Sequence, residues 1–328
     1  MSTRALALVL LFTTALAAAQ EPPVAPDVRA VLTKYLKFSS SDLADLGRRI
    51  VKHTLPSSAA GEVAVVGAVR IQASKGAFFD RVRDIARFKS GPDVLQVGRF
   101  STPPVIEDLA SLIVEQGDFD PHACQPGDCG VRLPAAMIER VRRDGAASQL
   151  KAFIFEKTLA YVSGAPDPMP QFDDGPRPIR ARNELAGILA AMPEIGALVP
   201  SLPEHLRSFP SARVAGADDF LYWSKEKFGI APFITVTHVT ILCPSASTCV
   251  MTTRDVYSSR YLDASVALAI ATDAGPGAFD LIYDNRSRAD ALKGAFGGLR
   301  RSLTERRARG GLEDSLKAIR SWLEEPAR

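Results

Sequence analysis

The first third of the chain moves between a helical and a strand-like pattern of apolar positions. Apolar residues recur at three- and four-residue spacing through residues 26–55, which predicts an N-terminal helical segment in which Ser41 caps a second helix. A valine-rich run at 62–71 is typical of a buried strand, and a helix over 75–88 and a strand over 94–100 follow it. The pattern therefore predicts a strand-helix-strand unit behind the helical segment.

The middle of the chain is mostly helical, and the part after it is strand-like. Helical spacing dominates from about 103 to 216, around a proline-rich loop at 165–178. Five strand-like runs separated by short turns then follow, at 220–228, 233–242, 250–259, 261–272 and 278–285. Strands joined by such short turns must be antiparallel neighbours, so we expect a meander. In 233–242 one face carries alternate residues, namely Ile234, Val236, His238, Thr240 and Leu242.

The last part of the chain predicts two helices. One apolar stripe consists of Leu292, Phe296, Leu299 and Leu303, and Ser287 is placed to cap the helix that carries it. A Gly310-Gly311 break precedes a final helix, whose apolar positions are Leu312, Leu316, Ile319 and Leu323. We therefore predict an α+β fold with a curved antiparallel sheet that grips a long C-terminal helix. Two apolar walls would then enclose a cavity suited to a hydrophobic guest.

This order of elements resembles the START-like superfamily, also called SRPBCC or helix-grip proteins. The residues that carry the resemblance are the opening strand-helix unit at 62–84, the meander, and the passage from last strand to helix at 283–301. The resemblance implies a helix-grip domain over 62–326 with a helical insertion at about 103–216. It also implies binding of lipids, sterols, aromatic polyketides or other apolar molecules, with a minority of members catalytic. The insertion departs from the family pattern, in which the second and third strands are nearly adjacent.

The N-terminus has the three-part pattern of a secretory signal peptide. Arg4 precedes an apolar run, and the small residues Ala17, Ala18 and Ala19 follow it, so we expect cleavage after residues 1–19. An uncleaved anchor is the alternative, but the run is shorter than the roughly 20 residues that cross a bilayer. We therefore predict a periplasmic or secreted protein without a stable membrane span. Such a location excludes roles that depend on cytosolic nicotinamide or ATP.

Charge and sequence motifs exclude several other classes of function. The chain has 40 basic and 37 acidic residues, and its densest basic patch, around Arg306, has the spacing of a solvated helix face. We therefore expect no nucleic-acid partner. The motifs of serine hydrolases, metalloproteases and nucleotide-binding loops are absent, and we expect no cofactor. The histidines His53, His122, His205 and His238 lack helical ligand spacing, and we expect no metal site.

The four cysteines form two close pairs in the sequence. Cys124 and Cys129 enclose one turn-forming segment, and Cys243 and Cys249 enclose another. In an oxidising compartment this spacing predicts two local disulfides, each contributing about 2 kcal/mol. A zinc site with four thiolate ligands is the alternative, although its usual C-x-x-C spacing is absent.

Several polar residues of the meander are candidates for binding a ligand. His238 could donate a hydrogen bond to a polar head group or act as a base, although a histidine satisfied by its neighbours explains the same position. Trp223 and Lys225 face one way and Tyr222 the other. The first two could hold an anionic head group, or they could be a core tryptophan and a lysine at the rim.

A second group of candidates lies on the next two strands and the last helix. Arg254, Tyr257, Tyr261 and Asp263 place polar groups on neighbouring strands, and Arg254 and Asp263 could pair across the sheet. Such a pair anchors a ligand if it is buried, whereas an exposed pair is worth less than about 1 kcal/mol. Phe296 belongs to a helix with glycines at 294, 297 and 298, each costing about 1 kcal/mol relative to alanine. Close helix-to-sheet contact or space for a ligand would explain them.

Together these patterns predict an exported, non-catalytic carrier for a lipid or another apolar small molecule. Two alternatives stay open. One is an enzyme on the same scaffold, with cyclase-like or hydrolytic activity that uses His238 with Asp263 or Tyr257. The other is an interaction module of the cell envelope in which side chains fill the cavity.

Overall fold

The computed structural model describes residues 26–145, 148–174, 178–227, 231–294 and 297–325. The predicted signal peptide and Phe296 lie outside these ranges. The described residues form a central eight-stranded antiparallel sheet with strand order β1-β2-β10-β9-β8-β7-β6-β3, which is open at its two edges. The strands are β1 (Val51–Thr54), β2 (Glu62–Ile71), β3 (Val94–Arg99), β6 (Asp218–Glu226), β7 (Phe233–Leu242), β8 (Thr248–Ser258), β9 (Ala264–Gly275) and β10 (Ala278–Arg288). A separate ribbon pairs β4 (Gln171–Phe172) with β5 (Ile179–Arg180).

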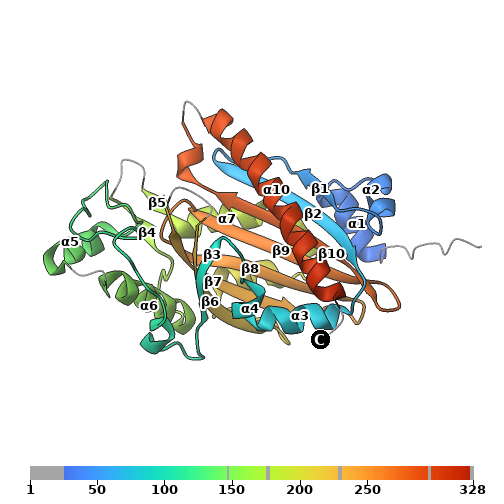
Figure 1. Ribbon diagram of the computed structural model, residues 1–328, viewed down its shortest axis with the longest axis horizontal. Coiled ribbons are helices and arrows are strands. Elements are labelled where there is room, and N and C mark those ends of the chain that lie inside the picture. Colours follow the sequence, from blue (N-terminus) through green and yellow to red (C-terminus); the bar gives the residue numbers. More distant parts are fainter. Residues whose placement is uncertain (1–25, 146–147, 175–177, 228–230, 295–296, 326–328) are drawn as a thin grey trace, which may run out of the picture.

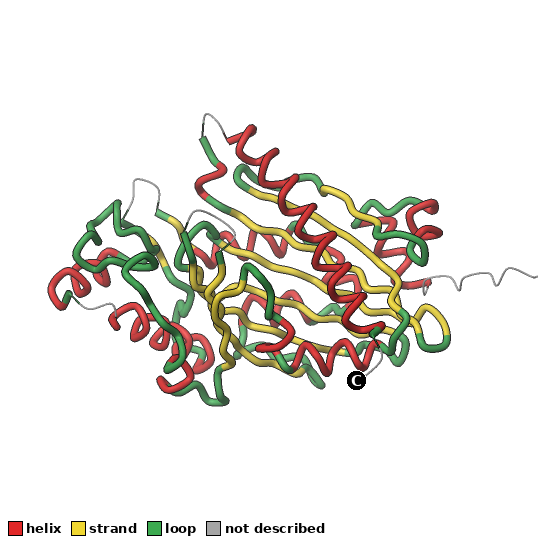
Figure 2. Tube along the Cα trace, viewed as in Figure 1, coloured by secondary structure: helices red, strands yellow, loops and turns green. Residues whose placement is uncertain are grey.

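Helices cover both faces of the sheet (Figures 1 and 2). One face carries α3, α4 and α10, which pack with Val239 and Ile241 of β7. The other face carries the remaining helices, which pack with Val236 and Leu242 of the same strand. The helices are α1 (Pro26–Tyr35), α2 (Ser40–Asp45), α3 (Lys75–Arg83), α4 (Ile85–Phe88), α5 (Ala135–Asp144), α6 (Ser148–Ser163), α7 (Ala181–Ala190), α8 (Pro193–Leu198), α9 (Leu202–Ser208) and α10 (Gly297–Glu324), with 3₁₀ turns η1 (Ile106–Leu109) and η2 (Asp290–Leu292).

The predicted five-strand antiparallel meander is confirmed. Between β2 and β3 the predicted helix is divided into α3 and α4, and the region 103–216 contains α5 to α9 together with the β4–β5 ribbon and loops. Strands β6 to β10 follow one another in the chain and are neighbours in the sheet. Each face of β7 packs against a different group of helices because alternate side chains of a strand point to opposite sides. The α+β class and the antiparallel sheet are therefore correct at this level.

The N-terminal segment differs from the prediction in two ways. Residues 51–54 form β1, which pairs with β2 from Val51↔Ala68 to Thr54↔Val65, and not the end of a helix. The side chain of Ser39, and not that of Ser41, caps α2 by accepting a hydrogen bond from the Asp42 amide. Residues 51–54 form a strand because the edge of β2 offers unpaired backbone groups that a four-residue strand can satisfy, whereas the Ser39 cap is a local contact with the first turn of α2.

The C-terminal helix also differs from the prediction. Helix α10 runs through Gly310-Gly311 without a break. Its N-terminal stripe is largely exposed, with Leu299 64% and Leu303 47% accessible, whereas Leu312 and Leu316 are buried against β2. A Cβ on Gly67 of β2 would lie 2.9 Å from Leu316 Cδ1 and 3.1 Å from Leu312 Cδ2. The closest contact between helix and sheet therefore lies at the C-terminal half of the helix, where side chains fill the space.

The passage from β10 to α10 is a strand where a helix cap was predicted. Ser287 is part of β10, pairs with Ser265 of β9 and hydrogen-bonds to that hydroxyl at 2.9 Å. Neighbouring strands on both sides hold β10 in place up to Arg288. Hydrogen bonds to two strands outweigh the local capping preference of the serine.

Both predicted disulfides are present. The S–S bonds join Cys124 to Cys129 and Cys243 to Cys249, and all four cysteines are thereby paired. The second bridge closes the turn between β7 and β8, as the spacing predicted. Among the described residues, no helix combines the length and the apolar character that a membrane crossing requires.

Candidate functional site

Two histidines and an aspartate converge on the sheet face opposite α10. Asp219 lies on β6, His238 on the adjacent β7, and His205 on α9, which packs over them. The Nε2 atom of His205 lies 3.0 Å from Asp219 Oδ1, and the Nε2 atom of His238 lies 3.1 Å from the same oxygen. These three groups are close enough for one atom of each to contact a single metal ion. Sequence spacing shows no sign of this cluster because the two histidines lie on elements that only the fold brings together.

Two further side chains complete this cluster. The Thr240 hydroxyl donates a hydrogen bond to Asp219 Oδ1 at 2.8 Å, and the Tyr161 hydroxyl lies 2.7 Å from His238 Nδ1. Burial alone would raise the pKa of Asp219, but hydrogen bonds from His205, His238 and Thr240 hold it well below its usual value. Burial lowers the pKa of His238 to about 4, so this imidazole is neutral at pH 7.

Arg254 lies beside this cluster but does not pair with Asp263 as predicted. Its guanidinium stacks over the Tyr161 ring at 4.6 Å and donates hydrogen bonds to the Leu206 carbonyl and, at 3.2 Å, to Met169 Sδ. In the register of the sheet, Arg254 is opposite Val266 of β9 and not Asp263. Arg254 is therefore directed at the helices that cover this face.

Asp263 forms ion pairs with residues other than Arg254. It pairs with Arg132 at 2.8 Å and with Lys293 at 3.5 Å, ahead of the first residue of β9. Tyr257 also connects to Arg132, because its hydroxyl donates to that residue's carbonyl at 3.0 Å. The Tyr261 hydroxyl donates to the Ala231 carbonyl at 3.0 Å. Of these three predicted ligand residues, Tyr257 lies on β8, whereas Tyr261 and Asp263 lie in the loop between β8 and β9. Phe296 lies outside the described residues.

Trp223 and Lys225 hold the segment that follows β3. The Trp223 indole Nε1 donates to the Asp108 carbonyl at 2.8 Å. The Lys225 ammonium forms an ion pair with Asp118 at 2.5 Å and donates to the Ile113 carbonyl at 3.2 Å. Both side chains are buried, so their polar atoms are already used by the protein.

Tyr222 points to the opposite face and belongs to a second polar cluster. There the Lys89 ammonium lies 2.8 Å from Glu226 Oε1, and the Thr237 hydroxyl donates to Asp255 Oδ1 at 3.1 Å. Burial raises the pKa of Asp255 to about 7, and neighbouring Glu226 adds to this shift. Lys89 and Asp255 were not among the predicted site residues, because no motif connects them.

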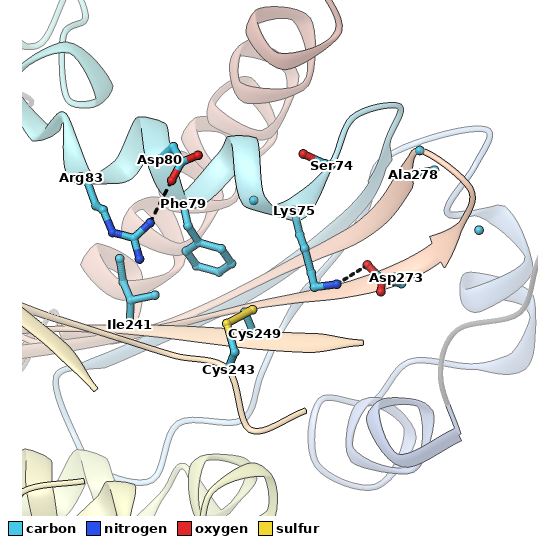
Figure 3. A pocket seen from close by; sticks show the side chains of 13 residues that line it. Ser74, Lys75, Phe79, Asp80, Arg83, Ile241, Cys243, Cys249, Asp273 and Ala278 are labelled. Carbon is cyan, nitrogen blue, oxygen red and sulfur yellow. Dashed lines mark hydrogen bonds and ion pairs between the residues drawn. A yellow bond between two sulfur atoms is a disulfide. The ribbon is translucent and has the colours of Figure 1, made fainter. Parts of the chain in front are cut away.

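An open cleft of about 500 Å³ lies on the α10 side of the sheet, between α3 and the ends of β7 to β10 (Figure 3). Its apolar residues are Phe79 of α3, Ile241 of β7 and the Cys243–Cys249 disulfide. Charged side chains line its rim, among them Lys75, which forms an ion pair with Asp273 at 2.5 Å. The sequence predicted the disulfide and the helix but not that they enclose a cleft.

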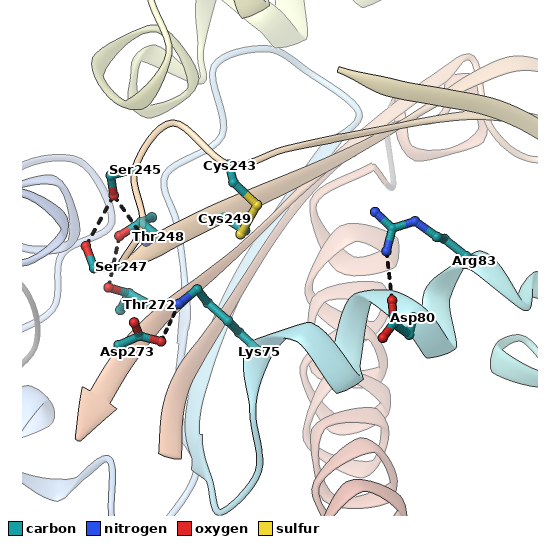
Figure 4. Close-up of a disulfide and its surroundings, with 10 residues drawn as sticks. All are labelled: Lys75, Asp80, Arg83, Cys243, Ser245, Ser247, Thr248, Cys249, Thr272 and Asp273. Atoms are coloured by element: carbon teal, nitrogen blue, oxygen red, sulfur yellow. Dashed lines mark hydrogen bonds and ion pairs between the residues drawn. A yellow bond between two sulfur atoms is a disulfide. The ribbon is translucent and has the colours of Figure 1, made fainter. Parts of the chain in front are cut away.

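The disulfide holds the strand turn at the side of this cleft (Figure 4). Within the turn, the hydroxyls of Ser245 and Ser247 lie 3.2 Å apart, and the Ser245 hydroxyl accepts a hydrogen bond from the Thr248 amide at 3.1 Å. The Thr248 hydroxyl is 3.1 Å from that of Thr272 on β9. The turn is therefore fixed both covalently and by hydrogen bonds.

The glycines near the start of α10 do not mark a contact with the sheet. Gly294 has a φ of +93°, which favours glycine, and a Cβ on Gly297 would lie 2.4 Å from the Leu292 carbonyl oxygen. A Cβ on Gly298 would meet no atom within 4 Å among the described residues. The first two glycines are explained by the turn that enters the helix.

Comparison with known proteins gives no relative from which a role could be carried over. No family model, curated protein or solved structure matches this chain. A function for this protein must therefore be inferred from its own residues.

Proposed function

We propose that this protein is an exported, non-catalytic carrier for a lipid or another largely apolar small molecule, bound in the cleft between α3 and β7 to β10. The observation that carries the proposal is the combination of an apolar lining, formed by Phe79, Ile241 and the Cys243–Cys249 disulfide, with a charged rim. Small-molecule sites commonly have volumes of about 300–1,000 Å³ and join an apolar lining to a few polar groups. The cleft, at about 500 Å³, lies within that range.

The polar groups at the rim suit a guest with a head group. Lys75 pairs with Asp273, and Arg83 pairs with Asp80 at 3.0 Å (Figures 3 and 4). These are partly exposed pairs, which contribute little to stability and can therefore exchange partners at low cost. A bound carboxylate could replace Asp273 beside Lys75 while the apolar body of the guest covers Phe79.

The order of the elements supports a START-like architecture as part of this proposal. The chain runs from β2 through α3 and β3 to the meander and ends in α10, which is the order on which the resemblance depends. Helices α3 and α10 lie on the same face of the sheet as the cleft. We place the ligand beside α3 and not under α10, because Leu312 and Leu316 fill the space over β2.

The disulfides support export. Both bridges form between residues close in the chain, and all four cysteines take part. Disulfides persist in oxidising compartments such as the periplasm or the extracellular space. Together with the N-terminal signal pattern, they make a periplasmic or secreted location part of the proposal.

An enzymatic role for His238 has less support. Both ring nitrogens of His238 already have partners, in Asp219 and Tyr161, and its side chain is inaccessible. The partners suggested for catalysis, Asp263 and Tyr257, interact instead with Arg132. A base needs a path to its substrate, and this histidine is covered by helices.

The test is a binding titration with a fluorescent apolar anion, 1-anilinonaphthalene-8-sulfonate, followed by displacement with a medium-chain fatty acid. Gly76 lines the cleft on α3, and a Cβ there would meet only the Ser74 hydroxyl at 3.8 Å, so Gly76→Phe should fill the cleft without disturbing the core. We expect this variant to weaken binding at least about 10-fold, a change of about 1.4 kcal/mol. The matched control is Gly91→Phe, whose site has no atom within 4 Å and lies outside the cleft. Equal binding by Gly76→Phe and the unmodified protein would contradict the proposal.

A further inference from the structure

We propose that His205, Asp219 and His238 form a binding site for one divalent transition-metal ion, with Zn²⁺ as the best-suited ion. The site lies on the sheet face opposite the α3 cleft and does not depend on the carrier proposal. Two imidazoles and one carboxylate are a donor set found in zinc enzymes and in other transition-metal sites.

The positions of the three donor atoms suit a common ion. Both imidazoles direct the same ring atom, Nε2, to a single oxygen, Asp219 Oδ1, at 3.0 and 3.1 Å. All three atoms lie within 4.8 Å of one another. Ligands bound at about 2.0–2.2 Å to one zinc ion are separated by about 3 Å or slightly more. The two distances from Asp219 Oδ1 are therefore close to the spacing of neighbouring ligands around a zinc ion.

Hydrogen bonding alone explains this arrangement less well. Asp219 Oδ1 lies within hydrogen-bond distance of three groups, namely the two imidazoles and the Thr240 hydroxyl at 2.8 Å. A carboxylate oxygen has only two lone-pair directions in its plane, so three donors crowd it. An ion among the three ligands would replace two of these hydrogen bonds with coordinate bonds.

The charge of Asp219 provides a second argument. Its side chain is only 12% exposed, and in the described part of the chain its ionic partners are the two histidines, with no lysine or arginine among them. Arg254, which lies nearby, directs its guanidinium at the Leu206 carbonyl and Met169. A carboxylate in such largely buried surroundings is stabilised by a nearby positive charge. A divalent ion would supply the missing positive charge.

The surroundings also fit a coordination site. Strands β6 and β7 are adjacent and hold Asp219 and His238 on a rigid sheet, and the Tyr161 hydroxyl fixes the second ring nitrogen of His238 at 2.7 Å. Ligating histidines usually have such a partner on the other nitrogen. Thr240 Oγ1, 3.2 Å from His205 Nε2, places a further oxygen beside the three donor atoms, and Asp219 is the partly exposed member of the cluster.

The experiment uses tag-free, full-length mature protein that has been treated with a chelator and dialysed. Isothermal titration with Zn²⁺ should show one site per chain, and Co²⁺ should produce the visible absorption bands of a protein-bound ion. His205→Gln, which keeps the size of the side chain, should weaken Zn²⁺ binding by about 100-fold or more, since it removes one of three ligands. The control is His53→Gln, because His53 lies on β1 and pairs with Asp42 at 3.3 Å.

Thermal unfolding keeps the test decisive if a variant is less stable. Zn²⁺ should raise the Tm of the unmodified protein and of His53→Gln but not that of His205→Gln or Asp219→Asn. Absence of one-to-one binding in the unmodified protein would overturn the proposal. Binding that persists in His205→Gln, or that is lost equally in His53→Gln, would overturn it as well.

Discussion

The Tyr161 hydroxyl lies 2.7 Å from His238 Nδ1, so a helix of the insertion and a strand of the meander share a buried polar contact. Tyr161 is on α6, whose buried side chains also pack against Tyr257 on the same face. The ring of Tyr161 stacks on Phe209 at 5.3 Å and lies under Arg254. The insertion is thereby attached to the sheet through specific buried groups.

Removing this contact should destabilise the protein. Tyr161→Phe takes away the hydroxyl and leaves His238 Nδ1 buried without a partner, which costs about 1–3 kcal/mol. The free energy of unfolding, measured by urea denaturation at pH 7, should fall by that amount. Tyr35→Phe is the control, since Tyr35 is half-buried on α1 and forms no hydrogen bond through its hydroxyl in the described part of the chain. A Tyr161→Phe variant as stable as the control would show that the contact is weak.

Asp255 should make stability depend on pH. Burial raises its pKa to about 7 from the ordinary 3.8, so the native state binds more protons than the unfolded state between about pH 4 and 7. The free energy of unfolding should therefore decrease as the pH rises through this window. At about 1.4 kcal/mol per pKa unit, the total from this group is at most about 4 kcal/mol.

Asp255→Asn tests that dependence. The amide keeps the acceptor for the Thr237 hydroxyl but cannot ionise, so urea denaturation between pH 4 and 8 should give a flatter profile and higher stability at pH 8. The control is Asp80→Asn, because the Asp80 side chain is 78% exposed in the unmodified protein. A profile that is unchanged in Asp255→Asn would mean that another group causes the slope.

The packing of α10 on β2 should depend on the side-chain volume at position 67. A Cβ there would lie 2.9 Å from Leu316 Cδ1, so Gly67→Val should cost about 1–3 kcal/mol by overpacking. Leu316→Ala alone should cost about 2–5 kcal/mol because it leaves a cavity. In the double variant each change partly relieves the other, so the summed losses should exceed the measured loss. Strict additivity in urea denaturation would show that the two side chains do not compete for space.

Much of the sheet can be predicted from the sequence, because its signals are local. The alternation over 233–242 identifies both faces of β7, and the short turns allow only antiparallel neighbours. Strand β1 is missed because four residues with mixed polarity become a strand only when β2 is beside them. Similarly, Gly310-Gly311 stays helical because Leu312 and Leu316, in the following turns, pack on the sheet.

The sites are much harder to predict, because they depend on contacts between distant parts of the chain. His238 is identified as unusual, but its partners Asp219 and Tyr161 and the neighbouring His205 come from three other elements. Arg254 lies on β8 as predicted, but Asp263 lies just ahead of β9, and the register places Arg254 opposite Val266. Charge alone does not reveal register, and each of these residues finds a partner in a helix or loop that no sequence spacing indicates.

Removing each disulfide in turn should distinguish an effect on stability from an effect on ligand binding. Replacing either pair by serines should lower the free energy of unfolding by about 2 kcal/mol, because each bridge closes a short loop. Only the Cys243–Cys249 pair lines the α3 cleft, so its double serine variant should also weaken binding of 1-anilinonaphthalene-8-sulfonate. The Cys124–Cys129 double variant should bind the probe normally at temperatures where both variants are folded, as judged by circular dichroism. If both variants lost binding equally, the loss would follow from general destabilisation, and the disulfide would have no direct role in the cleft.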